Sequence, residues 1–326
     1  MFNKTKLKFD DIFDGLLSDD EIREYLISLY EKGEDAEDIA GAASAMREHS
    51  VLLPIPYEFE LKLVDNCGTG GDKSSSFNVS STVSLLLAAC GCYVAKHGNR
   101  SVTSNSGSAD MLEALGVNLN VDFSKQVQML TETGFIFMFA VNHHPAMARI
   151  MPIRKSIPHR TIFNILGPLT NPAGAVKQLI GVFDKEYIHK MVEALKLLGA
   201  KRVMVVSSAD GLDEISISDV TYATTLIDGV IEDLIIDPRD YGFEIYPFDD
   251  IKGGSAKENA AITRGILEGT IKGAKLDIVL LNTAAALLVD GMVDNMHDGI
   301  KIAKEAIESG KAKEKLEQII EVSQGL

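Results

Sequence analysis

The chain has 326 residues, of which 46% are hydrophobic and 24% charged; this is the composition of a globular protein, at a length that favours two domains of unequal size. Its formal net charge of −15 would repel a nucleic-acid backbone or an anionic membrane over most of the surface, so we expect neither as a partner. An anionic small molecule would need a local positive pocket or a divalent metal.

Cysteine content and terminal sequence indicate a cytoplasmic protein. Cys67, Cys90 and Cys92 match neither a disulfide framework nor the spacing of a zinc or redox motif, so reduced thiols are expected. Residues 1–10 alternate lysine with apolar residues and lack the apolar segment of a signal peptide. No stretch approaches the about 20 apolar residues that a membrane-spanning helix needs.

Residues 1–60 have helical patterns. Residues 18–21 (Ser-Asp-Asp-Glu) have the form of a capping box, and apolar residues then recur with helical spacing over 22–29. Gly33 would end that helix and Asp35 would begin another. We therefore predict a small all-helical domain over residues 1–60.

From residue 61 onwards, short apolar runs alternate with amphipathic segments such as 185–198. This alternation predicts a large α/β domain over residues 61–326, with a mostly parallel sheet flanked by helices. The proline-containing segment 154–172 interrupts the alternation, and we expect the chain to return to the helical domain there, over about 154–178. The predicted strands are residues 61–64, 93–95, 135–140, 179–183, 203–206 and 277–281.

A glycine-rich loop, Asp-Asn-Cys-Gly-Thr-Gly-Gly-Asp at residues 65–72, follows the first predicted strand. Its glycines let the backbone approach a ligand and turn N–H groups towards it, as in loops that bind phosphate. A helix starting near Asn78 would add N-terminal donors. The spacing is neither that of a P-loop nor that of a dinucleotide-binding loop. A tight turn without a ligand is the alternative.

A second loop, residues 96–104, follows the next predicted strand. Lys96 and Arg100, with His97 between them, form a basic cluster in a protein with few positive charges. Because α/β folds place ligands at the carboxyl ends of their strands, this loop strengthens the case for an anion site. A solvated surface loop is the alternative.

A pair of carboxylates, Asp213 and Glu214, follows the predicted strand 203–206. Mg²⁺ commonly takes one or two carboxylates together with substrate phosphate oxygens and water. Such a metal would let an acidic protein bind a pyrophosphate, although an Asp-Glu pair alone is more often a solvated turn.

Six motifs, taken in order, resemble the motif series of anthranilate phosphoribosyltransferases. The dense part of the resemblance covers residues 61–216 and continues more loosely to both ends. The fold of that family is shared with pyrimidine nucleoside phosphorylases. The motifs are Gly-Thr-Gly-Gly-Asp (68–72), Asn-Val-Ser-Ser (78–81), Lys-His-Gly-Asn-Arg (96–100), Ser-Gly-Ser-Ala-Asp (106–110), Arg-Thr-Ile-Phe-Asn-Ile-Leu-Gly-Pro-Leu-Thr-Asn-Pro (160–172) and Gly-Leu-Asp-Glu (211–214).

The resemblance implies a set of site residues. The metal ligands would be Ser80, Asp213 and Glu214, holding two Mg²⁺ ions, and anthranilate would contact Gly68, Asn99 and Arg154. Lys96, His97, Asp213 and Glu214 would act in the reaction, His97 in positioning or hydrogen bonding. Phosphoribosyl pyrophosphate would be bound by Gly68, Gly71, Asp72, Ser76, Asn78, Val79, Ser80, Ser81, Lys96, His97, Gly98, Asn99, Arg100, Ser101, Val102, Thr103, Ser104 and Ser108.

This chain departs from the family pattern at four places. Ser81 stands in place of a usual Thr, and Asn105 in place of a common Lys. Residues 155–160 read Lys-Ser-Ile-Pro-His-Arg where an acidic residue and a glycine are more usual, and residues 208–210 lack a common His. None of these changes removes an expected ligand. His143 and His144 are expected at a helix start or along the acceptor site rather than on a metal.

The activity implied by the resemblance is transfer of the phosphoribosyl group of phosphoribosyl pyrophosphate to the amine of anthranilate in tryptophan biosynthesis, by a homodimer joined through its helical domain. Two other functions stay open. A nucleoside phosphorylase would use phosphate and a nucleoside on the same fold. A non-enzymatic, nucleic-acid-binding relative would lack the metal pair and carry a basic face.

Overall fold

The computed structural model describes residues 1–72, 74–100 and 106–326. A seven-stranded sheet of order β3-β2-β1-β4-β5-β6-β7 forms its centre. Strands β3, β2, β1, β4 and β5 are parallel to one another, and β6 and β7 are antiparallel additions. This confirms the predicted α/β class. The strands are β1 (Leu63–Gly68), β2 (Tyr93–Gly98), β3 (Phe135–Phe139), β4 (Lys177–Gly181), β5 (Arg202–Ser208), β6 (Thr221–Ile227) and β7 (Val230–Ile236).

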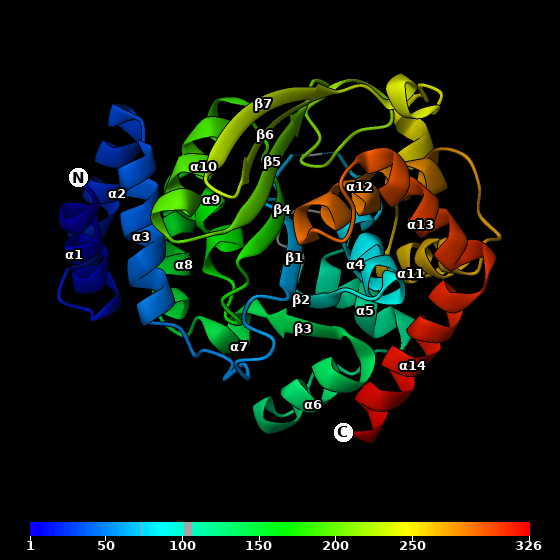
Figure 1. Ribbon diagram of the computed structural model, residues 1–326. Helices are drawn as coiled ribbons and strands as arrows, with labels where there is room; N and C mark the ends of the chain where they lie inside the picture. The colour runs from blue at the N-terminus through cyan, green and yellow to red at the C-terminus, as the bar shows by residue number, and fades with distance from the viewer. Residues whose placement is uncertain (73, 101–105) are drawn as a thin grey trace.

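Helices cover both faces of the sheet (Figure 1). The three N-terminal helices lie to the left, beyond α8 and α10, and the C-terminal helices lie to the right with α4 and α5. Their bounds are α1 (Phe2–Phe13), α2 (Asp19–Lys32), α3 (Ala36–Glu48), α4 (Val79–Cys90), α5 (Ser108–Leu115), α6 (Phe123–Thr133), α7 (Ala140–His143), α8 (Met147–Ser156), α9 (Phe163–Leu166), α10 (Glu186–Leu197), α11 (Ala256–Leu267), α12 (Ala274–Asp290), α13 (Met296–Glu308) and α14 (Lys311–Gly325), with 3₁₀ turns η1 (Gly167–Thr170), η2 (Pro238–Tyr241) and η3 (Phe248–Ile251).

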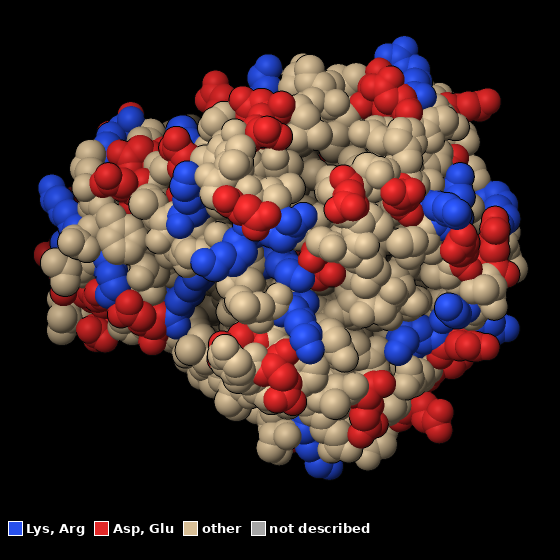
Figure 2. All heavy atoms as spheres, in the orientation of Figure 1, with Lys and Arg blue, Asp and Glu red and all other residues tan. Residues whose placement is uncertain are grey.

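The charged side chains are unevenly placed on the surface. On the face seen in Figure 2, basic side chains form a run across the centre and acidic side chains lie around them. Despite the net charge of −15, the acidic side chains therefore do not cover this face uniformly. In the described part of the chain, no helix combines the length and the apolar character needed to cross a membrane.

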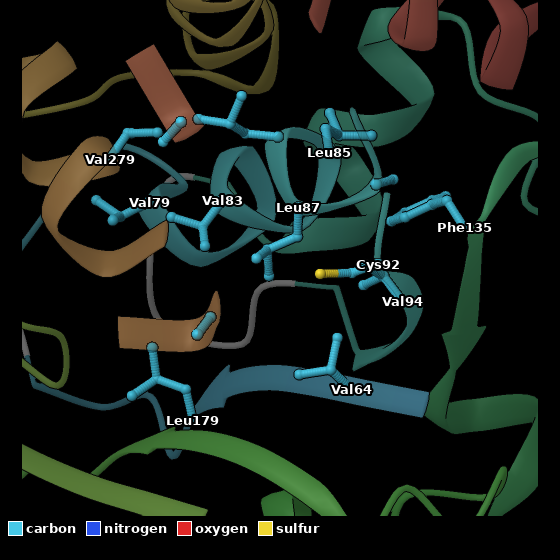
Figure 3. Close-up of a cluster of buried hydrophobic side chains, with 14 of the residues drawn as sticks. Val64, Val79, Val83, Leu85, Leu87, Cys92, Val94, Phe135, Leu179 and Val279 are labelled. Atoms are coloured by element: carbon cyan, nitrogen blue, oxygen red, sulfur yellow. The ribbon is translucent and has the colours of Figure 1, made fainter. Parts of the chain in front are cut away.

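Two apolar cores lie on opposite sides of the sheet. In β5, Val203 and Val205 belong to one core and Met204 and Val206 to the other, because successive side chains of a strand point to opposite faces. The larger core packs α4, α5 and α11 to α14 against the sheet. Figure 3 shows part of it, with side chains of α4 between those of the strands and α12.

The smaller core joins the N-terminal helices to the middle of the chain. Its members include Phe9 of α1, Ile150 of α8 and Leu169 of η1. The ring of Phe9 lies 5.6 Å from that of Phe163, edge to face. Arg47 of α3 donates to the carbonyl of Leu169 at 2.7 Å. The segment 150–169 therefore returns to α1–α3.

Local sequence signals set the N-terminal helices. Ser18 and Asp35 each cap a helix through a complete capping box, with Glu21 and Asp38 as the reciprocal partners. Gly33 ends α2 with φ +77°, a conformation that glycine adopts at little cost. These predictions are confirmed.

One predicted strand is wrong. Residues 277–281 lie inside α12, which is buried on almost all sides. An all-round apolar helix lacks the 3.6-residue alternation that distinguishes a helix from a buried strand. The other five predicted strands are confirmed within a few residues, as is the helix predicted over 185–198.

The hairpin of β6 and β7 was not predicted. Its two-residue connection is Asp228-Gly229, with φ +51° and +87°, the combination typical of a type I′ hairpin turn. The polar composition of β6 hides the apolar run that marks the parallel strands. The Asp-Gly dipeptide was the available signal.

Gly41 allows α1 and α3 to approach closely, and this generates a stability prediction. A Cβ at Gly41 would lie 2.6 Å from the carbonyl oxygen of Phe2 and 3.0 Å from the nitrogen of Lys6. In an open helix, Gly→Ala would stabilise by about 0.5–1 kcal/mol. Here we expect Gly41→Ala to lower the free energy of unfolding by about 1–3 kcal/mol in urea denaturation, because the two helices must separate.

Ser44→Ala, on the half-exposed part of the same helix, serves as the control for Gly41→Ala and should change the free energy of unfolding by less than about 0.5 kcal/mol. A Gly41→Ala protein as stable as the unchanged protein would contradict the close packing of α1 and α3.

Candidate functional site

The site is a cavity of about 350 Å³ where β1 and the connection after β5 meet the first turn of α4. Because β1, β2, β4 and β5 are parallel, their following loops all leave the sheet at one edge. Among the residues predicted from the sequence, those that line the cavity are Gly68, Gly71, Asp72, Ser76, Asn78, Val79, Ser80, Ser81, Ser108, Asp213 and Glu214.

The glycine loop is shaped by backbone conformation. Gly70 and Gly71 have φ +68° and +75°, the left-handed region that favours glycine. The N–H of Gly70 donates to Asp213 Oδ2 at 2.7 Å. Asn78 is the N-cap of α4, and Val79, Ser80 and Ser81 of the first turn line the cavity, so the positive end of that helix faces it. The loop and the helix together form a wall of donors.

Asp213 lies directly against the ends of two strands. A Cβ on Gly68 would be 2.2 Å from Asp213 Oδ2, and a Cβ on Gly181 would be 1.6 Å from the carbonyl oxygen of Asp213. Both positions therefore require glycine if the turn is to remain here. Glu214 is held by the other wall, where its Oε1 accepts from the N–H of Ser80 at 3.1 Å. The two carboxylates thus face the glycine loop and the start of α4.

The carboxylates are destabilised as anions. Burial, followed by the charges of Asp72 and Glu214, raises the pKa of Asp213 well above its usual value. Burial also raises the pKa of Glu214 to about 7, against the opposing effect of Lys96. Asp72 Oδ2 is buried and has no hydrogen-bond partner in the described part of the chain. Such a gathering of carboxylates calls for a cation.

The donor set fits Mg²⁺. Asp213 and Glu214 supply carboxylate oxygens, and Ser80 has its hydroxyl on the same wall. Within residues 1–72, 74–100 and 106–326, no group of three or more His, Cys, Asp or Glu side chains forms a ready-made metal cluster. Two carboxylates and a hydroxyl suit an ion that takes one or two carboxylates and completes its coordination with substrate phosphate and water.

Lys96 is the cation whose charge opposes the rise in the pKa of Glu214. Its side chain is 1% exposed, and Nζ donates to the carbonyl of Asn66 at 2.7 Å and to Ser80 Oγ at 3.4 Å. It lies beneath the wall of the cavity, behind Ser80. Its charge therefore acts on the site from within the protein.

His97 belongs to a buried histidine pair. Nδ1 is 3.1 Å from the carbonyl oxygen of Gly167, and Nε2 is 3.3 Å from Nε2 of His144. Burial and the neighbouring His144 lower the pKa of His97 to about 3, so the ring is neutral at physiological pH. His143 contacts the carbonyl of Val51 through Nδ1. Through these contacts, His97 and His143 connect their own segments to the backbone at Gly167 and Val51.

The basic loop after β2 is only partly described. The guanidinium of Arg100 pairs with Asp110 at 2.8 Å and with Glu113 at 2.6 Å, on the exposed side of α5. The carbonyl of Asn99 accepts from Ser108 Oγ at 3.1 Å. Gly98 approaches the same helix, since its Cβ would lie 2.4 Å from Ser108 Oγ. Ser101, Val102, Thr103 and Ser104 lie outside the described residues, as does Asn105.

Arg154 lies on α8, outside the residues that line the cavity. Its guanidinium is 5.9 Å from the ring centre of Phe163, and burial lowers its pKa. In the part of the chain that the structure describes, no carboxylate pairs with it. A half-buried guanidinium without a carboxylate partner can bind a planar anion by donating hydrogen bonds to it.

The last quarter of the chain supplies residues that sequence reasoning missed. Gly254 and Asn259 line the cavity. Asn259 Nδ2 donates to Asn78 Oδ1 at 2.9 Å, and Asn259 Oδ1 accepts from the N–H of Gly254 at 2.8 Å. The glycine pair before the capping box of α11, Ser255 with Glu258, was a usable sign of a helix N-terminus at a binding site.

Family models match both parts of the chain. The a/b domain of the glycosyl transferase family matches residues 60–313, and the helical bundle domain of that family matches residues 5–50. Among curated relatives, the anthranilate phosphoribosyltransferase of Methanobrevibacter smithii is 47% identical over 96% of this chain and 92% of its own length. The one from a Thermoanaerobacter species is 44% identical over 92% and 88%.

Solved structures agree with these matches. The anthranilate phosphoribosyltransferase of Thermus thermophilus superposes with a TM-score of 0.93 at 36% identity, covering 99% of this chain and 96% of that chain. The Saccharomyces cerevisiae enzyme in complex with PRPP and Mg has a TM-score of 0.86 at 30% identity, covering 94% and 86%. The chain therefore belongs to the anthranilate phosphoribosyltransferases of the glycosyl transferase family.

Proposed function

We propose that the protein transfers the phosphoribosyl group of 5-phosphoribosyl 1-pyrophosphate to the amine of anthranilate, releasing pyrophosphate, as a step of tryptophan biosynthesis. The observation that carries the proposal is the meeting of the glycine loop, the first turn of α4 and the Asp213-Glu214 pair around one cavity. The yeast relative solved with PRPP and Mg supports the same substrate and ion. A second yeast structure, in complex with 4-fluoroanthranilate, supports the acceptor.

The pyrophosphate would lie along the wall of donors formed by the glycine loop and α4. Asp213, Glu214 and Ser80 would hold Mg²⁺, two ions in all, which when bound would neutralise the pyrophosphate and ease its departure. Lys96, placed behind Ser80, would add a fixed positive charge. Because these groups are already in place, they need not reorganise when negative charge develops on the leaving group.

The reaction breaks the C1–O bond to pyrophosphate and forms a C1–N bond to the aromatic amine. The ribose would pass through an oxocarbenium-like state, and the main work of the protein is to hold the two substrates in line. An aromatic amine is neutral at pH 7, so its lone pair is available without a strong base, and its proton can pass to solvent. The neutral pair of His97 and His144 suits hydrogen bonding and positioning.

Arg154 would bind the carboxylate of anthranilate. It lies on α8, whose Ile150 and Ile153 are buried in the smaller core with the N-terminal helices. We further propose that residues 1–60 with the returning segment 154–178 form one domain and the remainder of 61–326 the other, and that the protein is a cytoplasmic homodimer joined through the helical domain. Chemical cross-linking and sedimentation would measure the oligomeric state.

Two other functions are less well supported. A nucleoside phosphorylase would have little use for a buried carboxylate pair beside its phosphate loop, and phosphorolysis of pyrimidine nucleosides is the assay for it. A nucleic-acid-binding role conflicts with the net charge of −15, and a gel shift at physiological salt is its test. The direct assay for the proposed reaction is loss of anthranilate fluorescence that depends on both PRPP and Mg²⁺.

The carboxylate pair, Asp213 and Glu214, generates a prediction about activity. Asp213→Asn combined with Glu214→Gln should lower Mg²⁺-dependent turnover at least about 100-fold, because charge stabilisation of the leaving group is lost. The unfolding temperature should not fall, since the neutral amides remove both the cost of burying the charges and their mutual repulsion, which together raise the two pKa values. Fluorescence assays and thermal unfolding measure the two effects.

Glu232→Gln, an exposed carboxylate on β7, is the control for that double variant and should retain full activity. Near-normal turnover by the double variant would refute the assignment of the metal to this pair.

Arg154 generates a second prediction. Arg154→Ala should raise the KM for anthranilate about 10- to 100-fold, the equivalent of the ~1.5–3 kcal/mol of a hydrogen bond to a charged group, with little change in the KM for PRPP. Arg149→Ala on the same helix, whose side chain donates instead to Leu17, is the matched control. An unchanged KM for anthranilate in Arg154→Ala would rule out the carboxylate role.

A further inference from the structure

The residue that follows the carboxylate pair is held by an asparagine from a distant helix. The N–H of Ile215 donates to Asn282 Oδ1 at 3.0 Å, and Asn282 Nδ2 donates back to the carbonyl of Ile215 at 2.7 Å. The same Nδ2 also donates to the carbonyl of Ile278, one turn earlier in α12, at 2.8 Å. Asn282 thus uses both of its amide hydrogens and its carbonyl oxygen.

These bonds take the place of the strand-to-strand hydrogen bonds that the chain lacks at this point. Between β5 and β6, residues 209–220 are irregular, so the backbone around Asp213 and Glu214 is not hydrogen-bonded into the sheet. The side-chain amide of Asn282 gives Ile215 the pair of backbone hydrogen bonds that a strand partner would have supplied. Asn282 is 1% exposed and Ile215 is fully buried, so neither group can exchange these bonds for water.

The opposite side of the same turn is fixed by steric contact. The carbonyl of Asp213 presses on Gly181 and its carboxylate on Gly68, as described above. The carboxylate pair is therefore confined between two glycines at the strand ends and one asparagine on α12. A turn held from both sides keeps the two carboxylates at a constant distance from Ser80 and the glycine loop.

We propose that Asn282 is a positioning residue that aligns Asp213 and Glu214 for Mg²⁺. The inference rests on the proposed function, which assigns the metal to this pair. Loss of a residue that orients metal ligands typically weakens metal binding 10- to 100-fold. Losing the amide of Asn282 should therefore raise the metal requirement of the protein while leaving the donors of the phosphate wall in place.

Two variants remove the bonds to Ile215. Asn282→Leu has the same branched arrangement of four side-chain heavy atoms, although it is larger, and it has no hydrogen-bonding group. Asn282→Thr keeps a hydroxyl that can bond to the carbonyl of Ile278, so it should fold even if the leucine variant does not. Both leave the N–H and carbonyl of Ile215 unpaired.

Two neighbours on α12 provide matched controls. Thr283 is fully buried, and its hydroxyl has no partner among the described residues, so Thr283→Val changes the same helix without removing a hydrogen bond found there. Leu281 is a fully buried core residue, so Leu281→Ala should lower the unfolding temperature without removing a hydrogen bond to Ile215. Leu281→Ala therefore shows whether lower stability alone weakens metal binding, without loss of the bonds that position Asp213 and Glu214.

The experiment titrates each folded protein with Mn²⁺ alone and follows free Mn²⁺ by electron paramagnetic resonance, alongside thermal unfolding and the Mg²⁺ concentration that gives half-maximal turnover. We expect both Asn282 variants to weaken Mn²⁺ binding at least tenfold and to raise the half-maximal Mg²⁺ concentration by a similar factor, with turnover recovering at high Mg²⁺. Thr283→Val and Leu281→Ala should bind Mn²⁺ like the unchanged protein.

Unchanged Mn²⁺ binding in a folded Asn282 variant would overturn the inference, as would an equal loss in Leu281→Ala. Failure of the proposed function would appear differently. An unchanged protein that binds Mn²⁺ but does not consume anthranilate with PRPP would contradict the transferase activity, whereas an active protein whose Asn282 variants bind Mn²⁺ normally would contradict only the role of Asn282.

Discussion

Close contact between Asp213 and the glycine ends of β1 and β4 is the constraint on which the site depends. The carbonyl and carboxylate of Asp213 occupy the space that a Cβ would fill at Gly181 and Gly68. This contact brings the turn after β5 up to the loop after β1, so one cavity is bounded by N–H donors on one side and by carboxylates on the other. Larger residues at Gly68 or Gly181 would push the loop after β1 and the turn after β5 away from each other.

That contact also explains how a protein with a net charge of −15 can bind a pyrophosphate. Buried carboxylates beside one another resist ionisation. The rise in the pKa of Glu214 to about 7 reflects the cost of burying its charge. Lys96 offsets part of it from behind the wall. A divalent ion shared with the substrate would offset the rest, so affinity for the anion would come from a metal held by acidic residues rather than from a basic surface.

The remaining parts of the chain support this centre from two directions. Asn259 of α11 bonds to Asn78 in the cavity wall, and Asn282 of α12 bonds to the residue after Glu214, so the C-terminal helices would support the proposed pyrophosphate end. The proposed acceptor end would be supported by the smaller core, where α8, which carries Arg154, packs with the N-terminal helices. The two substrates would thus be placed by two separate cores, joined across the sheet.

The sequence by itself determined those features that depend on neighbours along the chain. Caps such as Ser18 and Asp35, the glycine loop and the parallel strands follow from local conformational preferences and apolar periodicity, and the family motifs indicated Asp213 and Glu214. Only the tertiary structure decided that residues 277–281 belong to a helix, because a segment buried on all sides loses its periodicity. It also placed Gly181 and Asn282 against the turn that carries Asp213 and Glu214, since each makes its contact with a residue distant in the chain that no local pattern records.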